Sequence, residues 1–477
     1  MSDSPKPTTV GALRETGYAR RTVRDEIRLN LLSKLRTRQP VFEGIHGFDD
    51  SVMPAMYNAL LSGHDILLLG ERGQGKTRLI RQLVGLLDEW MPELDGSEVR
   101  DDPLAPISAW GKRHLSEAGD DAQVRWVNRS ERYGEKLATP DVATADLIGD
   151  IDPMKVVEGR SLSDEETIHF GLLPRTNRGI FCINELPDLT EKIQVALFNV
   201  MQERDFQIKG HRVRLPLDVM VVASANPEDY TSRGRIVTPL KDRYAAQIRT
   251  HYPPTRELEL SVVEQEAKVF SVEGVTVFMP EFMKRIVAEV TLQARASPDI
   301  NQASGVSVRL SIANYETLVA NALRRALSHG NGEAVPRVSD LGALHGSISG
   351  KIELEYAAAD RGEEEIVDGL VKRATAVVFD ELFDELVGDP EAGNAVVDAF
   401  DQGWMVEVSD DTPASEFMEG LAKIPGLSDL VGKFDPTDAP ARVAATIEFL
   451  LEGLHLRGRL NKQTEQRGSV YGKRAAG

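Results

Sequence analysis

The feature that most constrains this 477-residue chain is the stretch Ile66–Thr77, which reads Ile-Leu-Leu-Leu-Gly-Glu-Arg-Gly-Gln-Gly-Lys-Thr. A short aliphatic run leads into a glycine-rich turn, and apolar residues at helical spacing follow between Leu79 and Val84. This pattern predicts a strand, a loop and a helix in that order. Glycines allow the loop to turn its backbone N–H groups inward, and the start of a helix adds partial positive charge. The combination is typical of a loop that binds phosphate groups.

The positions of this loop have distinct expected roles. Lys76 is expected to reach the β- and γ-phosphates of a nucleoside triphosphate, and the Thr77 hydroxyl is expected to coordinate Mg²⁺. A glycine-rich turn that matches by chance is the alternative, but every required position is filled and both flanks fit. The predicted nucleotide-binding residues are Gly70, Glu71, Arg72, Gly73, Gln74, Gly75, Lys76, Thr77 and Arg78.

Charge and composition exclude several classes of protein. The formal net charge of −19 argues against nucleic acid or anionic membrane as the main partner. Basic residues gather at both ends of the chain, where they are more commonly solvated than part of a nucleic-acid site. No run approaches the ~20 apolar residues of a membrane span, and the N-terminus lacks a signal-peptide core. The only cysteine, Cys182, lies in an apolar run and is expected to be buried. We therefore expect a cytoplasmic protein.

The order of the predicted elements indicates an α/β fold. Apolar runs at residues 179–185 and 217–225 predict two further buried strands, each ending in polar residues, with a helix between them. Such an alternation predicts a mostly parallel sheet with the ligand beyond the carboxyl ends of its strands. From residue 255 onward the strand pattern almost vanishes, which predicts a helical domain and then a further acidic helical region. Residues 1–15 are expected to be disordered.

Candidates for phosphoanhydride hydrolysis lie downstream of the loop. This chemistry needs a metal holder, a group that activates water, and cations that stabilise the transferred phosphoryl group. Glu185, at the end of one buried strand, is placed to polarise the attacking water, and Asn226, at the end of the next, could hold that water or the γ-phosphate. Arg243 and Arg309 are cations that could reach a phosphate, from a neighbouring subunit and from the helical domain respectively. The alternatives are a helix cap for Glu185, a turn residue for Asn226 and surface ion pairs for the arginines.

With these residues in order, the chain resembles the AAA+ ATPases, and specifically the clade of the MoxR proteins and the magnesium-chelatase I subunit. The resemblance implies that Glu185 is the Walker B glutamate, Asn226 the sensor-1 asparagine, Arg243 the trans arginine finger and Arg309 the sensor-2 arginine. Arg233 and Arg235 are rival finger candidates. The phrases that carry the resemblance lie within residues 40–330 and are Gly171–Leu173, Asn177–Ile180, Asn184–Glu185, Ala225–Glu228 and Leu240–Tyr244.

The resemblance also implies an organisation and a set of partners. Proteins of this clade form hexameric rings, use ATP and Mg²⁺, and act on a partner that carries a von Willebrand A domain. The segments 146–170 and 205–215, the latter a predicted hairpin, match loops that the clade adds near the pore. The predicted domains are a basic N-terminal segment at 1–40, an AAA+ P-loop ATPase domain at 41–254, a helical lid domain at 255–360, an acidic helical C-terminal region at 361–456 and a basic flexible tail at 457–477.

Asn184 departs from the pattern of the clade. The family places an aspartate before the Walker B glutamate, and the predicted metal-site residues here are Thr77, Asn184 and Glu185. Asparagine keeps a carbonyl oxygen but loses the negative charge, so Mg²⁺ coordination should weaken and turnover should be slow. On this interpretation, an Asn184→Asp variant should change the Mg²⁺ dependence or the turnover.

Three functions remain open at this point. The first is an ATPase that remodels or loads a partner protein, with metal insertion into a tetrapyrrole and cofactor maturation as examples. The second is a σ54-dependent transcriptional activator, although the chain lacks a Gly-Ala-Phe-Thr-Gly-Ala loop and its acidic C-terminal region lacks a basic recognition helix. The third is an ATP-gated scaffold with little turnover.

Overall fold

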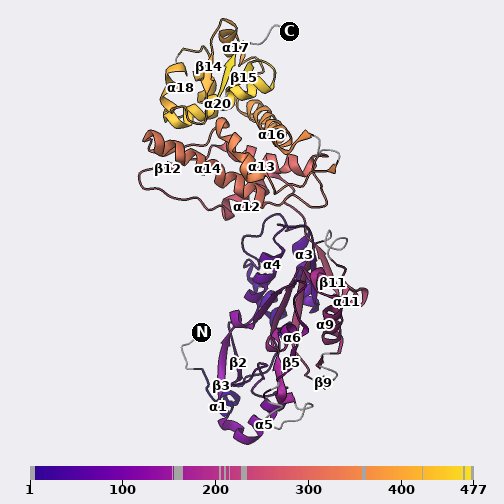
Figure 1. Ribbon diagram of the computed structural model, residues 1–477. Coiled ribbons are helices and arrows are strands. Elements are labelled where there is room, and N and C mark those ends of the chain that lie inside the picture. The colour runs from indigo at the N-terminus through magenta and orange to yellow at the C-terminus, as the bar shows by residue number, and fades with distance from the viewer. Residues whose placement is uncertain are drawn as a thin grey trace. The chain divides into compact units, whose positions relative to one another are not determined.

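The chain forms two compact units, Met1–His251 and Tyr252–Gly477, each with its own hydrophobic core (Figure 1). The structure is a computed structural model that describes residues 6–152, 154, 165–203, 206–208, 211–213, 215–226, 234–356, 361–421, 423–465 and 468–473. The first unit contains a parallel sheet covered by helices, and the second is largely helical. The predicted α/β fold class is confirmed.

The sheet of the first unit has five parallel strands in the order β11-β1-β10-β7-β4. Every residue of β1, β7 and β10 is buried, because helices cover both faces of the sheet. The strands are β1 (Ile66–Leu69), β4 (Tyr133–Leu137), β7 (Gly179–Asn184), β10 (Val219–Ala225) and β11 (Ala246–Arg249).

Alternation along the strands divides the first unit into two cores. Ile66, Leu68 and Cys182 contribute to the core beneath α2 (Val23–Thr37), α3 (Val52–Ser62) and α4 (Lys76–Gln82). Leu67 and Phe181 point to the opposite face, where α9 (Glu191–Glu203) and α11 (Thr238–Arg243) pack. The helix that follows the phosphate loop therefore lies on the same face as Cys182.

Short elements make up the rest of the first unit. Three antiparallel pairs, β2–β3, β5–β6 and β8–β9, lie outside the parallel sheet, and the last of them matches the hairpin predicted at 205–215. The elements are α1 (Val10–Glu15), η1 (Leu83–Leu86), β2 (Trp90–Leu94), α5 (Ala109–Ala118), η2 (Gly119–Asp121), β3 (Val124–Asn128), η3 (Arg129–Arg132), α6 (Thr144–Leu147), β5 (Gly149–Ile151), η4 (Glu165–Thr167), β6 (Ile168–Phe170), α8 (Leu172–Arg175), η5 (Leu186–Asp188), β8 (Phe206–Ile208) and β9 (His211–Val213).

Residues 6–15 pack into the first unit, which corrects the disorder predicted for residues 1–15 in the part that the structure describes. Thr9 caps α1, whose Val10 and Leu13 are buried in a small cluster with β2 and β3. In α2, Glu26 accepts two hydrogen bonds of 2.7 Å from Arg132, and both side chains are buried. Helix α1 has six residues and two buried apolar side chains, which is too short to give a periodic pattern. The sequence pattern therefore did not predict its packing.

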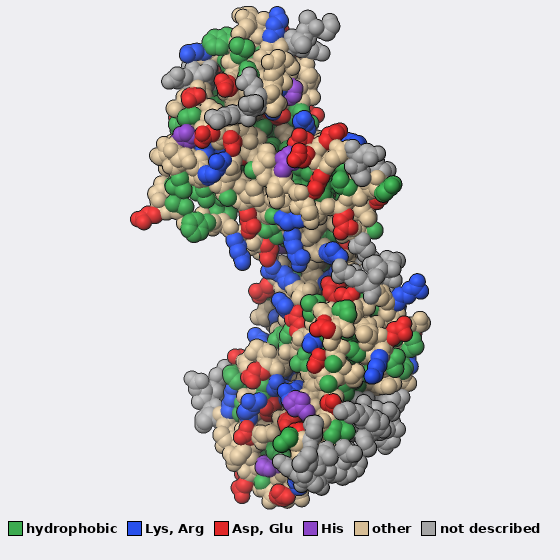
Figure 2. Space-filling model, in the orientation of Figure 1, with side chains coloured by type: hydrophobic (Ala, Val, Ile, Leu, Met, Phe, Trp, Pro, Cys, Tyr) green, Lys and Arg blue, Asp and Glu red, His purple; other side chains and the backbone are tan. Residues whose placement is uncertain are grey.

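Charges on the first unit are mixed. Of the N-terminal arginines, Arg24 pairs with Asp65 at 2.8 Å and Arg21 pairs with Asp88 at 2.6 Å. Figure 2 shows acidic and basic side chains interspersed over the face of the first unit that is in view. The basic character of the N-terminal sequence is thus balanced locally by acids from elsewhere in the fold.

The second unit has one continuous core that runs from Met279 to Tyr471. The predicted boundary at residue 360 therefore falls between segments that share this core. The helices are α12 (Arg256–Glu266), α13 (Glu281–Ala296), α14 (Arg309–His329), α15 (His345–Ile348), α16 (Glu363–Leu386), α17 (Asn394–Asp401), α18 (Ala414–Leu421), α19 (Leu427–Phe434) and α20 (Pro440–Leu456), with η6 at Val338–Leu344. The strands are β12 (Thr276–Val277), β13 (Glu333–Ala334), β14 (Val406–Val408), β15 (Asn461–Glu465) and β16 (Gly468–Gly472).

The segment predicted as a flexible tail forms part of a sheet instead. Strand β16 pairs with β14 on one side and with β15 on the other, antiparallel in both cases. Tyr471 is buried, and its hydroxyl donates to Glu452, which also accepts a 2.7 Å hydrogen bond from Lys462. The strands β15 and β16 are short and carry few apolar residues. The basic composition of the segment therefore led to the prediction of a flexible tail.

Candidate site for nucleotide binding and hydrolysis

The predicted phosphate loop joins β1 to α4 in a conformation that requires glycine. Gly73 and Gly75 both have φ of 75°, in the left-handed region that favours glycine. A Cβ on Gly70 would lie 2.0 Å from Thr250 Oγ1 and 2.2 Å from Gln74 Oε1. Thr250 and Gln74 therefore pack closely against the loop at Gly70.

Gln74 supports the loop from within. Its Oε1 accepts a 2.7 Å hydrogen bond from Thr250 Oγ1 and a 3.1 Å bond from the Glu71 backbone N–H. The Gln74 side chain is buried, whereas Arg72 and Arg78 are exposed. Gln74 is one of the predicted nucleotide-binding residues, and its hydrogen bonds hold the loop in its conformation.

Lys76, Asn226 and Glu185 form a chain of contacts across three neighbouring strand ends. Lys76 Nζ donates to the carbonyls of Gly70 and Glu71, the latter at 2.7 Å, and to Asn226 Oδ1 at 2.7 Å. Asn226 Nδ2 in turn donates to Glu185 Oε2 at 2.9 Å. Residues far apart in sequence meet here because β1, β10 and β7 are adjacent and parallel.

Glu185 has an unusual backbone conformation. Its φ of 57° and ψ of 47° place it in the left-handed region, which non-glycine residues rarely adopt. Its backbone N–H donates to Ser224 Oγ at 3.3 Å, on the neighbouring strand. Strained backbone of this kind clusters at functional sites, where it directs a side chain that a regular strand would point elsewhere.

Asn184 lies in a second chain of contacts that the sequence did not predict. Its Oδ1 accepts a 3.1 Å hydrogen bond from Ser224 Oγ, and its Nδ2 donates to Glu135 Oε1 at 2.6 Å. Glu135, on β4, also accepts two hydrogen bonds of 2.9 Å from Arg81 of α4. The hydrogen bonds from Arg81 hold the pKa of Glu135 below its usual range. The only sequence signal for Glu135 was a carboxylate inside a short strand.

Cys182 is buried, as its apolar surroundings predicted. Burial raises the pKa of the thiol to about 12, so the thiolate form is scarce at neutral pH. This excludes a nucleophilic role for Cys182 and assigns it to the core beneath α4.

The predicted arginines Arg243 and Arg309 lie on two helices, α11 of the first unit and α14 of the second. Arg243 ends α11, where its guanidinium donates to Gln202 Oε1 at 2.7 Å and lies 5.1 Å from the ring centroid of Phe198, both on α9. Arg309 begins α14 in the second unit, and its backbone N–H donates to Ser307 Oγ at 3.1 Å. The rival Arg235 is exposed. The other rival, Arg233, lies outside the described residues.

The donor set fits magnesium bound together with a nucleotide. The described residues contain no group of three or more His, Cys, Asp or Glu side chains that could hold a metal ion by themselves. Mg²⁺ is usually held by one or two protein oxygens, by water and by the phosphates of the substrate. Thr77, the Asn184 amide oxygen and the carboxylate of Glu185 supply oxygens of the kind this ion prefers.

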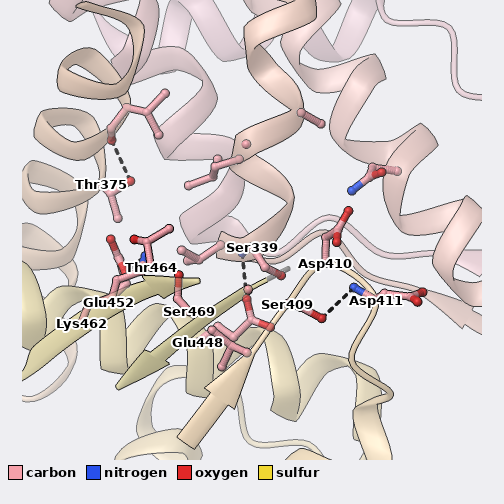
Figure 3. Close-up of a pocket in the computed structure, with 18 of the residues that line it drawn as sticks. Ser339, Thr375, Ser409, Asp410, Asp411, Glu448, Glu452, Lys462, Thr464 and Ser469 are labelled. Carbon is pink, nitrogen blue, oxygen red and sulfur yellow. Dashed lines mark hydrogen bonds and ion pairs between the residues drawn. The ribbon is translucent and has the colours of Figure 1, made fainter. Parts of the chain in front are cut away.

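A separate cleft of about 1040 Å³ lies within the second unit, between helices and the face of the β14–β16–β15 sheet. Figure 3 shows acidic, hydroxyl and lysine side chains converging on it. Its five acids have partners inside the protein. The pairs are Glu448–Arg337, Glu452–Lys462, Asp410–Arg324, Asp411–His329 and Asp368–His345. Because three of these acids pair with arginine or lysine and two pair with histidine, the cleft does not indicate the chemistry of a ligand.

Known proteins are similar to part of this chain. A family model described as the Sigma-54 interaction domain matches residues 159–240, which include Asn184, Glu185 and Asn226. The magnesium-chelatase 38 kDa subunit of Rhodobacter capsulatus is 26% identical over 228 residues, covering 47% of this chain and 59% of that protein. The magnesium-chelatase subunit ChlI of Porphyra purpurea is 28% identical over 249 residues, covering 50% of this chain and 65% of that protein.

The comparisons support the AAA+ clade of ATPases as the group that this chain resembles. The chain spans less than two thirds of the length of either curated relative. A solved structure described as a complex between the subunits BchI and BchD of magnesium chelatase is 19% identical, with a TM-score of 0.35, covering 67% of this chain and 98% of that one. None of the described helices combines the length and apolar character that a membrane span requires.

Proposed function

We propose that this protein is a Mg²⁺-dependent AAA+ ATPase that couples hydrolysis to the remodelling or loading of a partner protein in the cytoplasm. The observation that carries the proposal is the contact chain from Lys76 through Asn226 to Glu185. It joins a phosphate-binding cation, a polar amide and a carboxylate at the edge of the sheet where a nucleotide would lie.

Each member of the chain has a role in this proposal. Lys76 binds the β- and γ-phosphates, Glu185 orients and polarises the attacking water, and Asn226 fixes the position of Glu185 while contacting the γ-phosphate. When bound, Mg²⁺ neutralises charge on the phosphates, and the Thr77 hydroxyl and the Asn184 amide oxygen hold it. Left-handed backbone at Glu185 keeps the carboxylate directed at Asn226.

Nucleotide binding and turnover can be separated by substitution. Lys76→Ala should abolish binding of a fluorescent ATP analogue, whereas Lys112→Ala, an exposed lysine on α5, should bind as the wild type does. Glu185→Gln should keep binding and lose phosphate release. Binding without any phosphate release in the wild type would favour the ATP-gated scaffold over the ATPase.

Arg243 is proposed to act in a neighbouring subunit of a homo-oligomeric, hexameric ring. Its guanidinium is partly exposed and is held by Gln202 and Phe198 of α9, which supports a role in trans. Arg243→Ala should spare ATP binding and remove turnover, and Arg235→Ala serves as the matched comparison. The reverse pattern would assign the finger to Arg235. A protein that stays monomeric with and without ATP would refute the ring.

The partner is proposed to be a protein with a von Willebrand A domain, by similarity to the magnesium-chelatase relatives, and a tetrapyrrole substrate is one case within this proposal. Pull-down with and without ATP tests it. The match to the Sigma-54 interaction domain favours one second candidate, a σ54-dependent activator. ATP-dependent binding to σ54 RNA polymerase would support that candidate, and its absence together with capture of a von Willebrand A protein would support the first.

A further inference from the structure

The contact between Glu135 and Asn184 dictates which kind of residue can occupy position 184. An ionised carboxylate can only accept hydrogen bonds, so the group that faces Glu135 at 2.6 Å must be a donor. The amide of Asn184 meets this requirement with its Nδ2, which leaves its Oδ1 to face Ser224. The orientation of the amide is therefore fixed by its two neighbours.

An aspartate at position 184 would not fit the same surroundings. Its second oxygen would take the place of Nδ2 beside Glu135, and two carboxylates at that distance cannot both stay ionised without strong repulsion. The asparagine is thus matched to the glutamate on the neighbouring strand. Between them, the two residues carry one negative charge and one amide.

Arg81 links this pair to the helix that follows the loop. Thr77 and Arg81 are four residues apart on α4, so their side chains share one face of that helix. Arg81 holds Glu135 through two hydrogen bonds of 2.9 Å, and Glu135 holds Asn184. The carboxylate is therefore tied both to the helix that begins with Thr77 and to the residue that precedes Glu185.

We propose that Glu135 is a positioning residue of the magnesium site that acts through Asn184. With its carboxylate paired to Arg81, Glu135 fixes the Asn184 amide so that its carbonyl oxygen keeps one orientation. The inference rests on the proposed function, since it requires Mg²⁺ and ATP at the loop. An exposed Arg81–Glu135 ion pair alone would contribute little to stability, which leaves the tie to Asn184 as the distinctive feature.

The test compares four proteins: the wild type, Glu135→Gln, Asn184→Asp, and the double variant in which the charge is exchanged between the two positions. The readout is the affinity for a fluorescent ATP analogue with excess Mg²⁺ and with EDTA, followed by the Mg²⁺ dependence of phosphate release. Glu131→Gln, an exposed glutamate on η3, is the matched control.

Glu135→Gln should reduce the Mg²⁺-dependent gain in affinity about tenfold, because loss of an outer partner of a metal ligand weakens metal binding by roughly 10- to 100-fold. Its affinity in EDTA should match the wild type. Asn184→Asp should also lose the gain through repulsion, and the double variant should restore it to within about threefold. Equal weakening with and without Mg²⁺ in Glu135→Gln, or no rescue in the double variant, would overturn the assignment.

Measurements on the wild type distinguish failure of the proposed ATPase function from failure of the role assigned to Glu135. If the wild type fails to bind the ATP analogue under any condition, the proposed ATPase function is refuted and this inference falls with it. If the wild type binds and responds to Mg²⁺ while Glu135→Gln responds equally, only the role of Glu135 is refuted.

Discussion

Substituting Gly70 with alanine tests whether the side chains packed against Gly70 hold the predicted phosphate loop in its conformation. The added Cβ would lie 2.0 Å from Thr250 Oγ1 and 2.2 Å from Gln74 Oε1, inside both van der Waals contacts. These two atoms are hydrogen-bonded to each other at 2.7 Å, and Gln74 also holds the Glu71 N–H. The methyl group therefore displaces the contacts that shape the loop.

The expected cost has two parts. Separating Thr250 from Gln74 leaves buried polar groups unsatisfied, which costs about 1–3 kcal/mol. Forcing one extra carbon into a packed site costs about 1–3 kcal/mol more. We expect the first unit to lose about 2–6 kcal/mol of unfolding free energy, the lower end applying if the loop shifts. Because such a shift reshapes the loop, affinity for ATP should fall in either case.

Gly85→Ala is the matched control. Gly85 lies on η1, its φ is not positive, and a Cβ there meets no atom within 4 Å. The control should change stability by no more than about 1 kcal/mol and tend to stabilise. Urea unfolding followed by tryptophan fluorescence suits the measurement, since Trp90, Trp110 and Trp126 lie in the first unit and only Trp404 lies in the second. Equal stability and equal ATP affinity in the two variants would refute the packing account.

Three further predictions concern the rest of the fold. Glu26→Gln should destabilise the first unit by about 3–5 kcal/mol, because it leaves Arg132 charged and buried, and urea unfolding checks this. Cys182 should resist alkylation in the folded protein at pH 8 and react once urea unfolds it, since burial raises its pKa; rapid labelling of the native protein would contradict this. Truncation before residue 461 should lower the thermal midpoint of the second unit, because it uncovers the core at Tyr471; an unchanged midpoint would restore the flexible-tail interpretation.

The parts of the site that the sequence predicted share a property: each is defined by its own local surroundings. The phosphate loop is recognisable because strand, glycines, lysine and helix follow one another within a dozen residues. Glu185 and Asn226 are recognisable because each directly follows a continuous apolar run, the pattern of a strand buried on both faces. The parallel sheet then brings these strand ends together.

Contacts between distant segments escaped the sequence reasoning for a common reason. Glu135 and Asn184 lie on neighbouring strands, but their pairing depends on the register of β4 against β7, in which Glu135 lies opposite Cys182. Register is set by packing over the whole sheet, and no local pattern encodes it. The sequence pattern around Asn184 therefore predicts a weakened metal site but not the contact of Asn184 with Glu135.

The sequence by itself determined the strand, glycine-rich loop and helix around Lys76, the α/β class of the first unit, the helical character of the second, and the strand ends that Glu185 and Asn226 follow. Tertiary structure alone decided that residues 6–15 and the C-terminal strands are folded, because these short elements are stabilised by burial against distant partners such as Leu94 and Glu452. It also decided that the carboxylate beside Asn184 comes from another strand. Local composition records the elements of a fold, whereas charge compensation across strands exists only once the chain has packed.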